Sequence, residues 1–283
     1  MAEHKKRNAL SFETIDSSSD LIRYLDYGSR LNSSRYLYQY TTISALVNML
    51  RSKTMHLSNA KYMNDQLEYK NGDPQTWDNL FFSCFMMEDD ESIGMWGMYA
   101  QPWREGVKIS IPKEVLRRWI SETSELIEIS QESKQPTGRK ISDTSTFKLW
   151  ISTVAYSNFE GLEEKGTLET LRCGGQENRI LKNVPRRPEL TGYIKDMAWS
   201  YEKEVRVKAR FDNKMGFERI AIEMPEYVID SLVITPSPLF EGNIIERIKA
   251  EISRSILTDK SKFVDKLLIR SVCDNCSIAK KRW

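Results

Sequence analysis

Lys195-Asp-Met-Ala-Trp-Ser-Tyr-Glu-Lys-Glu-Val-Arg-Val-Lys-Ala-Arg-Phe211 is the stretch that decides the fold of this chain. Its second half alternates, so that apolar side chains fall on one face of an extended strand and charged side chains fall on the other. The apolar face comprises Val205, Val207, Ala209 and Phe211, and the charged face comprises Glu202, Glu204, Arg206, Lys208 and Arg210. Because a strand with one apolar face normally packs that face on a core, we predict a half-buried strand.

The charged face of this strand carries two carboxylates followed by three cations. Such a group suits a functional site, since carboxylates serve proton or hydroxyl chemistry and cations bind anionic ligands. It is also typical of a solvated outer face with cross-strand salt bridges. Both interpretations stay open at this point.

The composition is that of an ordinary soluble globular protein, with 283 residues, 40% hydrophobic and 29% charged. No apolar run approaches the roughly 18 residues that a membrane helix needs. The start, residues 1–7, lacks the apolar region of a secretory signal. A net charge of +2 gives no global attraction to nucleic acid or to a membrane surface. We therefore expect a cytoplasmic protein without a membrane partner.

Cysteine and histidine are too few and too scattered for a structural zinc site. Of the four cysteines, Cys273 and Cys276 form a Cys-x-x-Cys, while Cys84 and Cys173 are isolated. Zinc sites of this kind need four ligands, usually as two such pairs. We predict no bound metal and a reduced, cytoplasmic chain.

Short strand and helix patterns follow one another along the chain, which predicts the α+β class. We expect a single domain over residues 31–270, with a mostly antiparallel, short-stranded sheet flanked by helices. Residues 1–30 are predicted to form a polar N-terminal arm and residues 271–283 a basic C-terminal tail. Polar insertions are expected near 121–147 and 159–190. The strand patterns lie at 35–40, 54–58, 80–86, 107–111, 150–156, 219–223 and 231–234, and the helix patterns at 43–50, 92–100, 112–120 and 244–256.

Three separated motifs carry a resemblance to a known family. They are Asn64-Asp65-x-x-Glu68, Met95-Trp96-x-x-Tyr99, and Lys195 followed by Trp199-x-x-Glu202-x-Glu204-x-Arg206. In this order they resemble a bacterial family catalogued as a domain of unknown function, over roughly residues 35–270. Members usually have proline after Asn-Asp, where this chain has Gln66. The family name carries no activity.

A more distant likeness does carry an activity. An aromatic strand and helix, then serine-bearing strands, then a late strand led by Glu-x-Glu are together similar to the ADP-ribosyltransferase fold. The resemblance implies NAD as substrate and Glu204 as the catalytic acid, or Glu202 if the register differs. It places Tyr38 or Gln39 on the first NAD-binding strand. It also implies a supporting serine at Ser58 or Ser83.

The chemistry of the nicotinamide–ribose bond gives Glu-x-Glu a physical reason. Its cleavage passes through an oxocarbenium-like state, as in glycoside hydrolysis. A fixed carboxylate near the 2′-hydroxyl stabilises that positive charge in the transition state. A second carboxylate two residues away orients the acceptor nucleophile. Arg206, Lys208 or Arg35 would pair with the pyrophosphate.

Other candidate residues each have a structural alternative. Trp96 or Tyr99 would stack on nicotinamide or adenine, but both side chains are also typical of a hydrophobic core. Lys195 is assigned to substrate binding, with an ion pair to Glu202 as its alternative. Supporting roles are assigned to Asn64, Asp65 and Glu68, which otherwise serve as caps of a turn and a helix.

Three functions follow from these residues. The preferred one is an NAD-using ADP-ribosyltransferase-like enzyme or NAD glycohydrolase, acting as a bacterial toxin or anti-phage defence effector. Its partners would be NAD, an unidentified protein or nucleic-acid acceptor, and a protein partner or a second copy of the chain. The second is a metal-dependent nuclease, because clustered carboxylates also bind Mg²⁺; its ligands would be Asp65, Glu68, Glu202 and Glu204. The third is a non-catalytic module that binds nucleic acid or protein through Arg206, Lys208 and Arg210.

Overall fold

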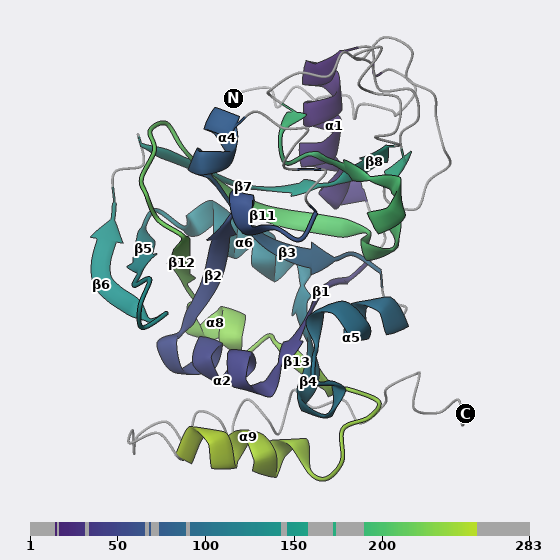
Figure 1. The fold of residues 1–283 in the computed structure, drawn as a ribbon, viewed down its shortest axis with the longest axis vertical. Coiled ribbons are helices and arrows are strands. Elements are labelled where there is room, and N and C mark those ends of the chain that lie inside the picture. Colours follow the sequence, from purple (N-terminus) through teal and green to yellow (C-terminus); the bar gives the residue numbers. More distant parts are fainter. Residues whose placement is uncertain are drawn as a thin grey trace, which may run out of the picture.

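A ten-stranded, mostly antiparallel sheet flanked by helices forms the body of the computed structural model (Figure 1). The structure describes residues 15, 17–31, 34–65, 68, 74–88, 91–142, 146–157, 172–173 and 190–253. A smaller three-stranded sheet lies beside it. The predicted α+β class with a mostly antiparallel sheet is confirmed.

Strands lie near all of the predicted positions, and four further strands lie where none was predicted. Thirteen are described: β1 (Tyr36–Thr42), β2 (Thr54–Asn59), β3 (Leu80–Met86), β4 (Gly106–Pro112), β5 (Leu126–Ile129), β6 (Pro136–Ile141), β7 (Phe147–Thr153), β8 (Ala155–Ser157), β9 (Arg172–Cys173), β10 (Ile194–Asp196), β11 (Glu204–Phe211), β12 (Arg219–Glu223) and β13 (Val233–Pro236). The single strand expected at 150–156 is two strands, β7 and β8, which belong to different sheets.

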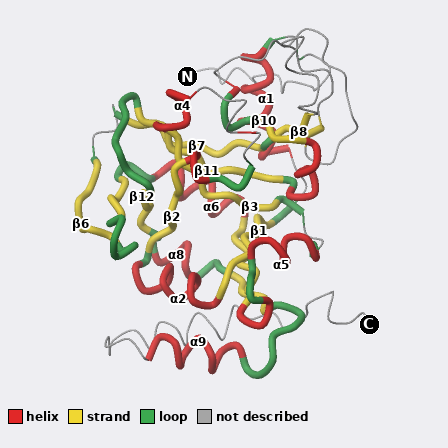
Figure 2. The backbone as a smooth tube through the Cα atoms, viewed as in Figure 1, coloured by secondary structure: helices red, strands yellow, loops and turns green. Residues whose placement is uncertain are grey.

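The helices pack around the strands, with α1 at one end of the molecule and α2 and α9 at the other (Figure 2). Their bounds are α1 (Ser18–Leu31), α2 (Ile43–Ser52), α4 (Pro74–Asn79), α5 (Ile93–Tyr99), α6 (Lys113–Glu122), α8 (Glu226–Ile229) and α9 (Ile244–Ser253). Short 3₁₀ turns include Ala60–Tyr62 and Met197–Glu202. Within the described residues, no helix is long and apolar enough to cross a membrane.

Local chemistry explains where the helices begin. The Thr42 side chain accepts from the backbone of Ala45 at 3.2 Å and caps α2. The Ser92 side chain accepts from Met95 at 3.3 Å and caps α5. The apolar stripe of α2, spaced i, i+3, i+4 and i+7, is buried in the main core as predicted.

Strand β11 forms as predicted, but its charged face is not solvated. Val205, Val207 and Ala209 pack into the main core. On the other face, Arg206 and Lys208 are both 0% exposed. That face is covered by the segment just before β10, since Arg206 donates to the Gly192 carbonyl at 3.0 Å. The alternation therefore marks one apolar face and one ionic face, and the ionic face is buried from Glu202 to Lys208 and exposed at Arg210.

Two polar segments are more ordered than their composition indicated. The expected N-terminal arm contains α1, whose Leu21 and Leu25 are fully buried in a cluster with Ala155 and Ile194. The expected surface insertion at 121–147 contains β5 and β6, which pair as an antiparallel hairpin on the main sheet. Most of the insertion at 159–190 and all of the tail at 271–283 lie outside the described residues. The division into arm, domain and tail stays a prediction.

Candidate functional site

The main sheet is split, and the candidate site lies in the split. Strand β3 pairs along its whole length with β11 on one side. On its other side it meets β1 only at Tyr38↔Met86 and β2 only at Ser58↔Phe82 and Asn59↔Phe81. Between these two contacts a cavity of about 330 Å³ opens. Divergence of β1 and β2 from β3 thus creates the site.

The backbone of Cys84 faces this gap. The bond from Met87 N to Lys203 O shows that the odd-numbered residues of β3 point toward β11. Even-numbered residues therefore point away: Phe82 and Met86 pair with β2 and β1, and Cys84 lies between them. In the described part of the chain the N–H and C=O of Cys84 have no strand partner, so a ligand in the cavity meets a donor and an acceptor side by side.

The two predicted carboxylates both line the cavity, and they are held differently. Tyr99 donates to Glu202 Oε1 at 2.5 Å, and Lys195 forms a short ion pair with the other oxygen of Glu202. The Lys195 ammonium also lies 3.5 Å from Glu204. One buried lysine thus bridges both acids from the wall of the cavity.

Arg206 holds the Glu204 carboxylate in a fixed position. Its Nε and Nη2 donate to the two oxygens of Glu204 at 2.8 and 3.0 Å. Its Nη1 and Nη2 donate to Glu68 at 2.6 and 2.9 Å, and Nη1 also donates to the Gly192 carbonyl. All five guanidinium donors are engaged, so Arg206 is a positioning residue with none left for a ligand.

These contacts separate the protonation of the two acids. Burial alone would raise the pKa of Glu204, but the charges of Arg206 and Lys195 outweigh it and hold that pKa at about 2. Burial and the neighbouring Glu204 charge raise the pKa of Glu202, against the opposing effect of Lys195. Glu204 therefore stays ionised at neutral pH, whereas Glu202 takes up a proton more readily than an ordinary glutamate.

Most of the residues predicted from the sequence do come together here. Those that line the cavity are Tyr38, Gln39, Ser58, Asn64, Ser83, Tyr99, Lys195, Glu202 and Glu204. They come from β1, β2, β3, α5, β10 and β11 and from the turns that follow β2 and β10. The convergence of these residues supports the idea that the separated motifs serve one site.

Four other predicted residues lie elsewhere. Trp96 is fully buried, with its ring edge-on to Tyr40 at 4.8 Å between centroids, so it is a core aromatic. Arg206 binds carboxylates rather than a pyrophosphate. Asp65 is buried and accepts from the backbone of Glu68 at 3.1 Å, as a cap does. Glu68 is the second anchor of Arg206.

The sequence did not single out several residues of the site. His56 lines the cavity, and burial followed by the nearby charge of Arg219 lowers its pKa. Cys84 had been set aside as an isolated cysteine, but burial and the charge of Glu204 raise the pKa of its thiol well above normal. Tyr156 accepts from the Glu204 backbone at 2.8 Å. Only the alternation of His56 within its strand offered a signal.

A second cavity adjoins the first. It encloses about 350 Å³ and shares Gln39 and His56 with the first cavity. Lys134 and Arg219 also line it. A ligand longer than a nucleoside can therefore extend from the acidic cavity toward two cations.

The geometry disfavours the two rival functions. The acids required by a metal-dependent nuclease are paired with cations, Glu68 and Glu204 with Arg206 and Glu202 with Lys195. Within the described residues, no three His, Cys, Asp or Glu side chains group as a metal site would require. Of the three residues predicted to form a basic binding face, Arg206 and Lys208 are buried and Arg210 is exposed, so they do not form one continuous basic surface.

Comparisons with known proteins give a family match and one structural likeness. Residues 95–207 match the family described as a protein of unknown function, DUF2971, which confirms the resemblance to a family without known activity. The match covers a minority of the 283-residue chain. No curated protein matches the sequence. The structure is similar to that of Thermus sp. 2.9 DarT in complex with carba-NAD+, at 10% identity and a TM-score of 0.31, over 79% of this chain and 91% of that one.

Proposed function

We propose that this chain binds NAD in the split of the main sheet and transfers its ADP-ribose to an acceptor or to water. The observation that carries the proposal is the pair of unlike carboxylates in one cavity. Glu204 is a fixed anion held by Arg206, and Glu202 keeps a raised pKa beside Tyr99 and Lys195. Pairs of acids whose environments drive their pKa values apart are typical of glycosyl-transfer sites.

The backbone of Cys84 suits the nicotinamide end of the ligand. A carboxamide presents one carbonyl acceptor and an NH₂ donor, as a peptide group does. It can therefore pair with the N–H and C=O of Cys84 in the place of a missing strand neighbour. Aromatic side chains of the same cavity, Tyr40, Phe82 and Phe85, offer apolar contact to the ring.

The adjoining cavity suits the rest of a dinucleotide. The first cavity, about 330 Å³, is small for a whole dinucleotide, and the second adds about 350 Å³. Lys134 and Arg219 in the second cavity provide positive charge for phosphate oxygens. We place the nicotinamide riboside beside the carboxylates and the phosphates toward these cations.

The residues then have defined roles in bond cleavage. The C1′–N bond breaks with its electron pair going to the nicotinamide nitrogen, which leaves as a neutral base. The ribose becomes oxocarbenium-like, and ionised Glu202 stabilises it from the 2′-hydroxyl side. The acceptor attacks C1′ and gives its proton to Glu202. Lys195 and Tyr99 hold Glu202 in place, and Glu204 adds fixed negative charge next to the developing cation.

Consumption of NAD by the purified chain, alone and with cell extract, tests this proposal. Release of nicotinamide is followed by chromatography, and NAD binding by thermal shift. Wild-type protein should consume NAD and Glu202→Gln should not, while Glu122→Gln, an exposed acid at the end of α6, should match the wild type. Absence of NAD loss under every condition, together with no thermal shift, would refute the proposal. The acceptor, the toxin or defence role, the cytoplasmic location and self-association stay predictions.

A further inference from the structure

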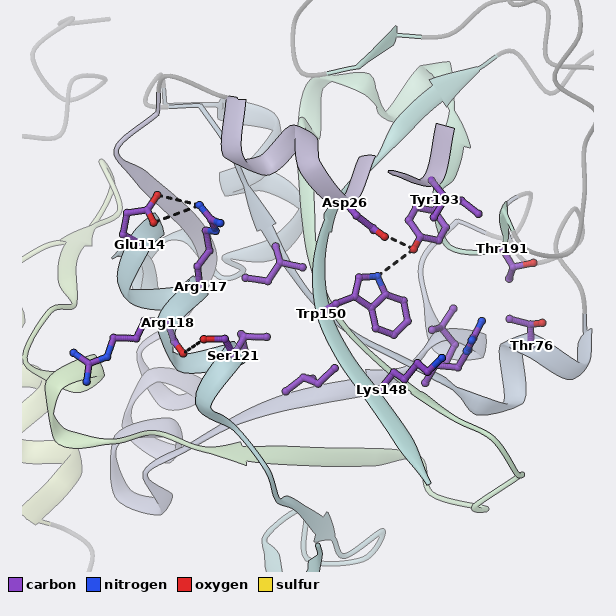
Figure 3. Close-up of a pocket in the computed structure, with 16 residues that line it drawn as sticks. Asp26, Thr76, Glu114, Arg117, Arg118, Ser121, Lys148, Trp150, Thr191 and Tyr193 are labelled. Atoms are coloured by element: carbon purple, nitrogen blue, oxygen red, sulfur yellow. Dashed lines mark hydrogen bonds and ion pairs between the residues drawn. The ribbon is translucent and has the colours of Figure 1, made fainter. Parts of the chain in front are cut away.

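A third cavity, separate from the proposed NAD site, lies along β7 (Figure 3). It encloses about 1020 Å³ and shares no lining residue with the acidic cavity. Helix α6 forms one wall, with Arg117 and Ser121, and α1 contributes Ile22 and Asp26. A cavity of this size holds a peptide segment rather than a side chain or two.

Strand β7 reaches this cavity with an unpaired edge. In the described part of the chain its only strand partner is β11. The bonds from Asp212 N to Thr146 O and from Val154 N to Glu204 O show that even-numbered residues of β7 point toward β11. Leu149 and Ile151 therefore direct their N–H and C=O groups away from the sheet, and both residues line the cavity.

The same cavity carries an uncompensated positive pair. Lys148 and Arg210 lie opposite each other in the register of β7 and β11, and both are exposed. Like charges at directly opposed positions destabilise a sheet. Among the described residues neither has an acidic partner, whereas Arg117 pairs with Glu114 at 3.3 Å. An anionic group from outside the described residues would offset the repulsion between Lys148 and Arg210.

The aromatic wall of the cavity is held rigid. Trp150 donates through its indole N–H to the Tyr193 hydroxyl at 3.1 Å, and Tyr193 donates to Asp26 at 3.1 Å (Figure 3). This chain of bonds ties β7 to α1 and fixes the Trp150 ring beside Lys148. A preformed wall lowers the entropy lost when a ligand binds.

We propose that the free edge of β7 is a strand-addition site for an extended, acidic segment of a partner protein. The segment pairs its backbone with Leu149 and Ile151, as in other cases of β-augmentation. Its acidic side chains on one face meet Lys148 and Arg210. Proteins normally protect an open sheet edge against such pairing. Here α1 and α6 flank the edge of β7, so that a segment reaches it through the cavity. The site is independent of the proposed NAD chemistry.

A displayed library of random nine-residue peptides is the probe for this site. It is panned against the full-length wild-type protein and against the double variant Lys148→Glu/Arg210→Glu. We expect acidic sequences to be enriched on the wild type alone, and the best peptide to bind the double variant at least tenfold more weakly by fluorescence anisotropy. Arg139→Glu, on another edge strand, β6, is the matched control and should bind like the wild type. Absence of enrichment, or equal enrichment on the double variant, would overturn the proposal.

Backbone pairing is tested separately with the best peptide. N-methyl groups are placed on alternate amides in two complementary patterns. Because alternate residues of a strand face opposite sides, one pattern should abolish binding and the other should leave it within a few fold. Equal effects of the two patterns would show that the peptide does not add as a strand, and the proposal would fall. NAD consumption by the double variant should equal that of the wild type.

Discussion

Arg206 and Glu204, two residues apart on β11, form a closed pair in which Nε and Nη2 donate to separate carboxylate oxygens at 2.8 and 3.0 Å. On a strand face the nearest neighbours usually belong to the adjacent strand, whereas both members of this pair belong to β11. Glu68 completes the arrangement from a segment 138 residues away in the sequence. Of this pair, only Glu204 lines the proposed NAD cavity. Four predictions concern the pair and its neighbours.

The two carboxylates should differ in what their loss changes. Glu202→Gln should lower the rate of NAD cleavage by at least about 100-fold, the loss typical of a group that stabilises transition-state charge. Its unfolding free energy should change little, because Lys195 keeps Glu204 at 3.5 Å. Glu204→Gln should lower both rate and stability. Steady-state kinetics and urea unfolding of both variants separate the cases, and equal profiles would contradict the assignment.

Removing the buried guanidinium should destabilise the fold strongly. Arg206→Met leaves Glu68 without its cation and Glu204 with only Lys195, 3.5 Å away, and breaking a buried ion pair in this way costs about 3–5 kcal/mol. Arg210→Met, on the same face of the same strand but exposed, should change the unfolding free energy by no more than about 0.5 kcal/mol. Urea unfolding of the two variants provides the measurement. Similar losses in both would show that the ionic layer is not what stabilises β11.

Acid stability should depend on Glu204 in a specific pH range. Its pKa is about 2 in the folded protein against an ordinary value of 4.5, so its ionised form stabilises the fold above pH 4.5. That contribution, on the order of 3 kcal/mol, is lost as the pH falls from 4.5 toward 2. The stability difference between the wild type and Glu204→Gln should therefore shrink over this range. A difference independent of pH would argue against a depressed pKa.

Lys208 should be a destabilising residue at neutral pH. Its Nζ lies 3.1 Å from the centre of the Tyr193 ring and has no hydrogen-bond partner among the described residues. Burial, then the charge of Arg206, lowers its pKa well below 10.5, although Asp26 opposes this. The folded state thus binds fewer protons than the unfolded state, so this residue lowers stability as the pH falls below 10.5.

Lys208→Met should accordingly raise the unfolding free energy by about 1–3 kcal/mol at pH 7, since an unsatisfied buried polar group is removed. The gain should be smaller near pH 10.5. Lys214→Met, whose side chain is 66% exposed, is the control and should have little effect. Thermal unfolding at the two pH values checks the prediction, and destabilisation at pH 7 would reveal an unseen partner for Lys208.

The residues that follow local rules were predictable from the sequence. Alternation over residues 205–211 predicted β11 and its core face, and the helix patterns at 43–50 and 92–100 predicted α2 and α5. The motifs, together with the resemblance to the ADP-ribosyltransferase fold, also named nine residues that the fold brings to one cavity. These results depend on contacts within a few residues, or on types of side chain, which a sequence displays directly.

Tertiary structure alone decided which groups face the ligand cavity. A two-residue period separates the faces of β11, but it does not say that the segment at Gly192 covers the charged face and buries Arg206. Nor does it show that β1 and β2 part from β3, which exposes the Cys84 backbone. Both facts arise from contacts between distant segments, and burial then converts a row of surface charges into ion pairs with separated pKa values. The sequence by itself determined the main strands and helices that carry the site and the types of side chain in it. The packing of distant segments decided the role of each of these groups.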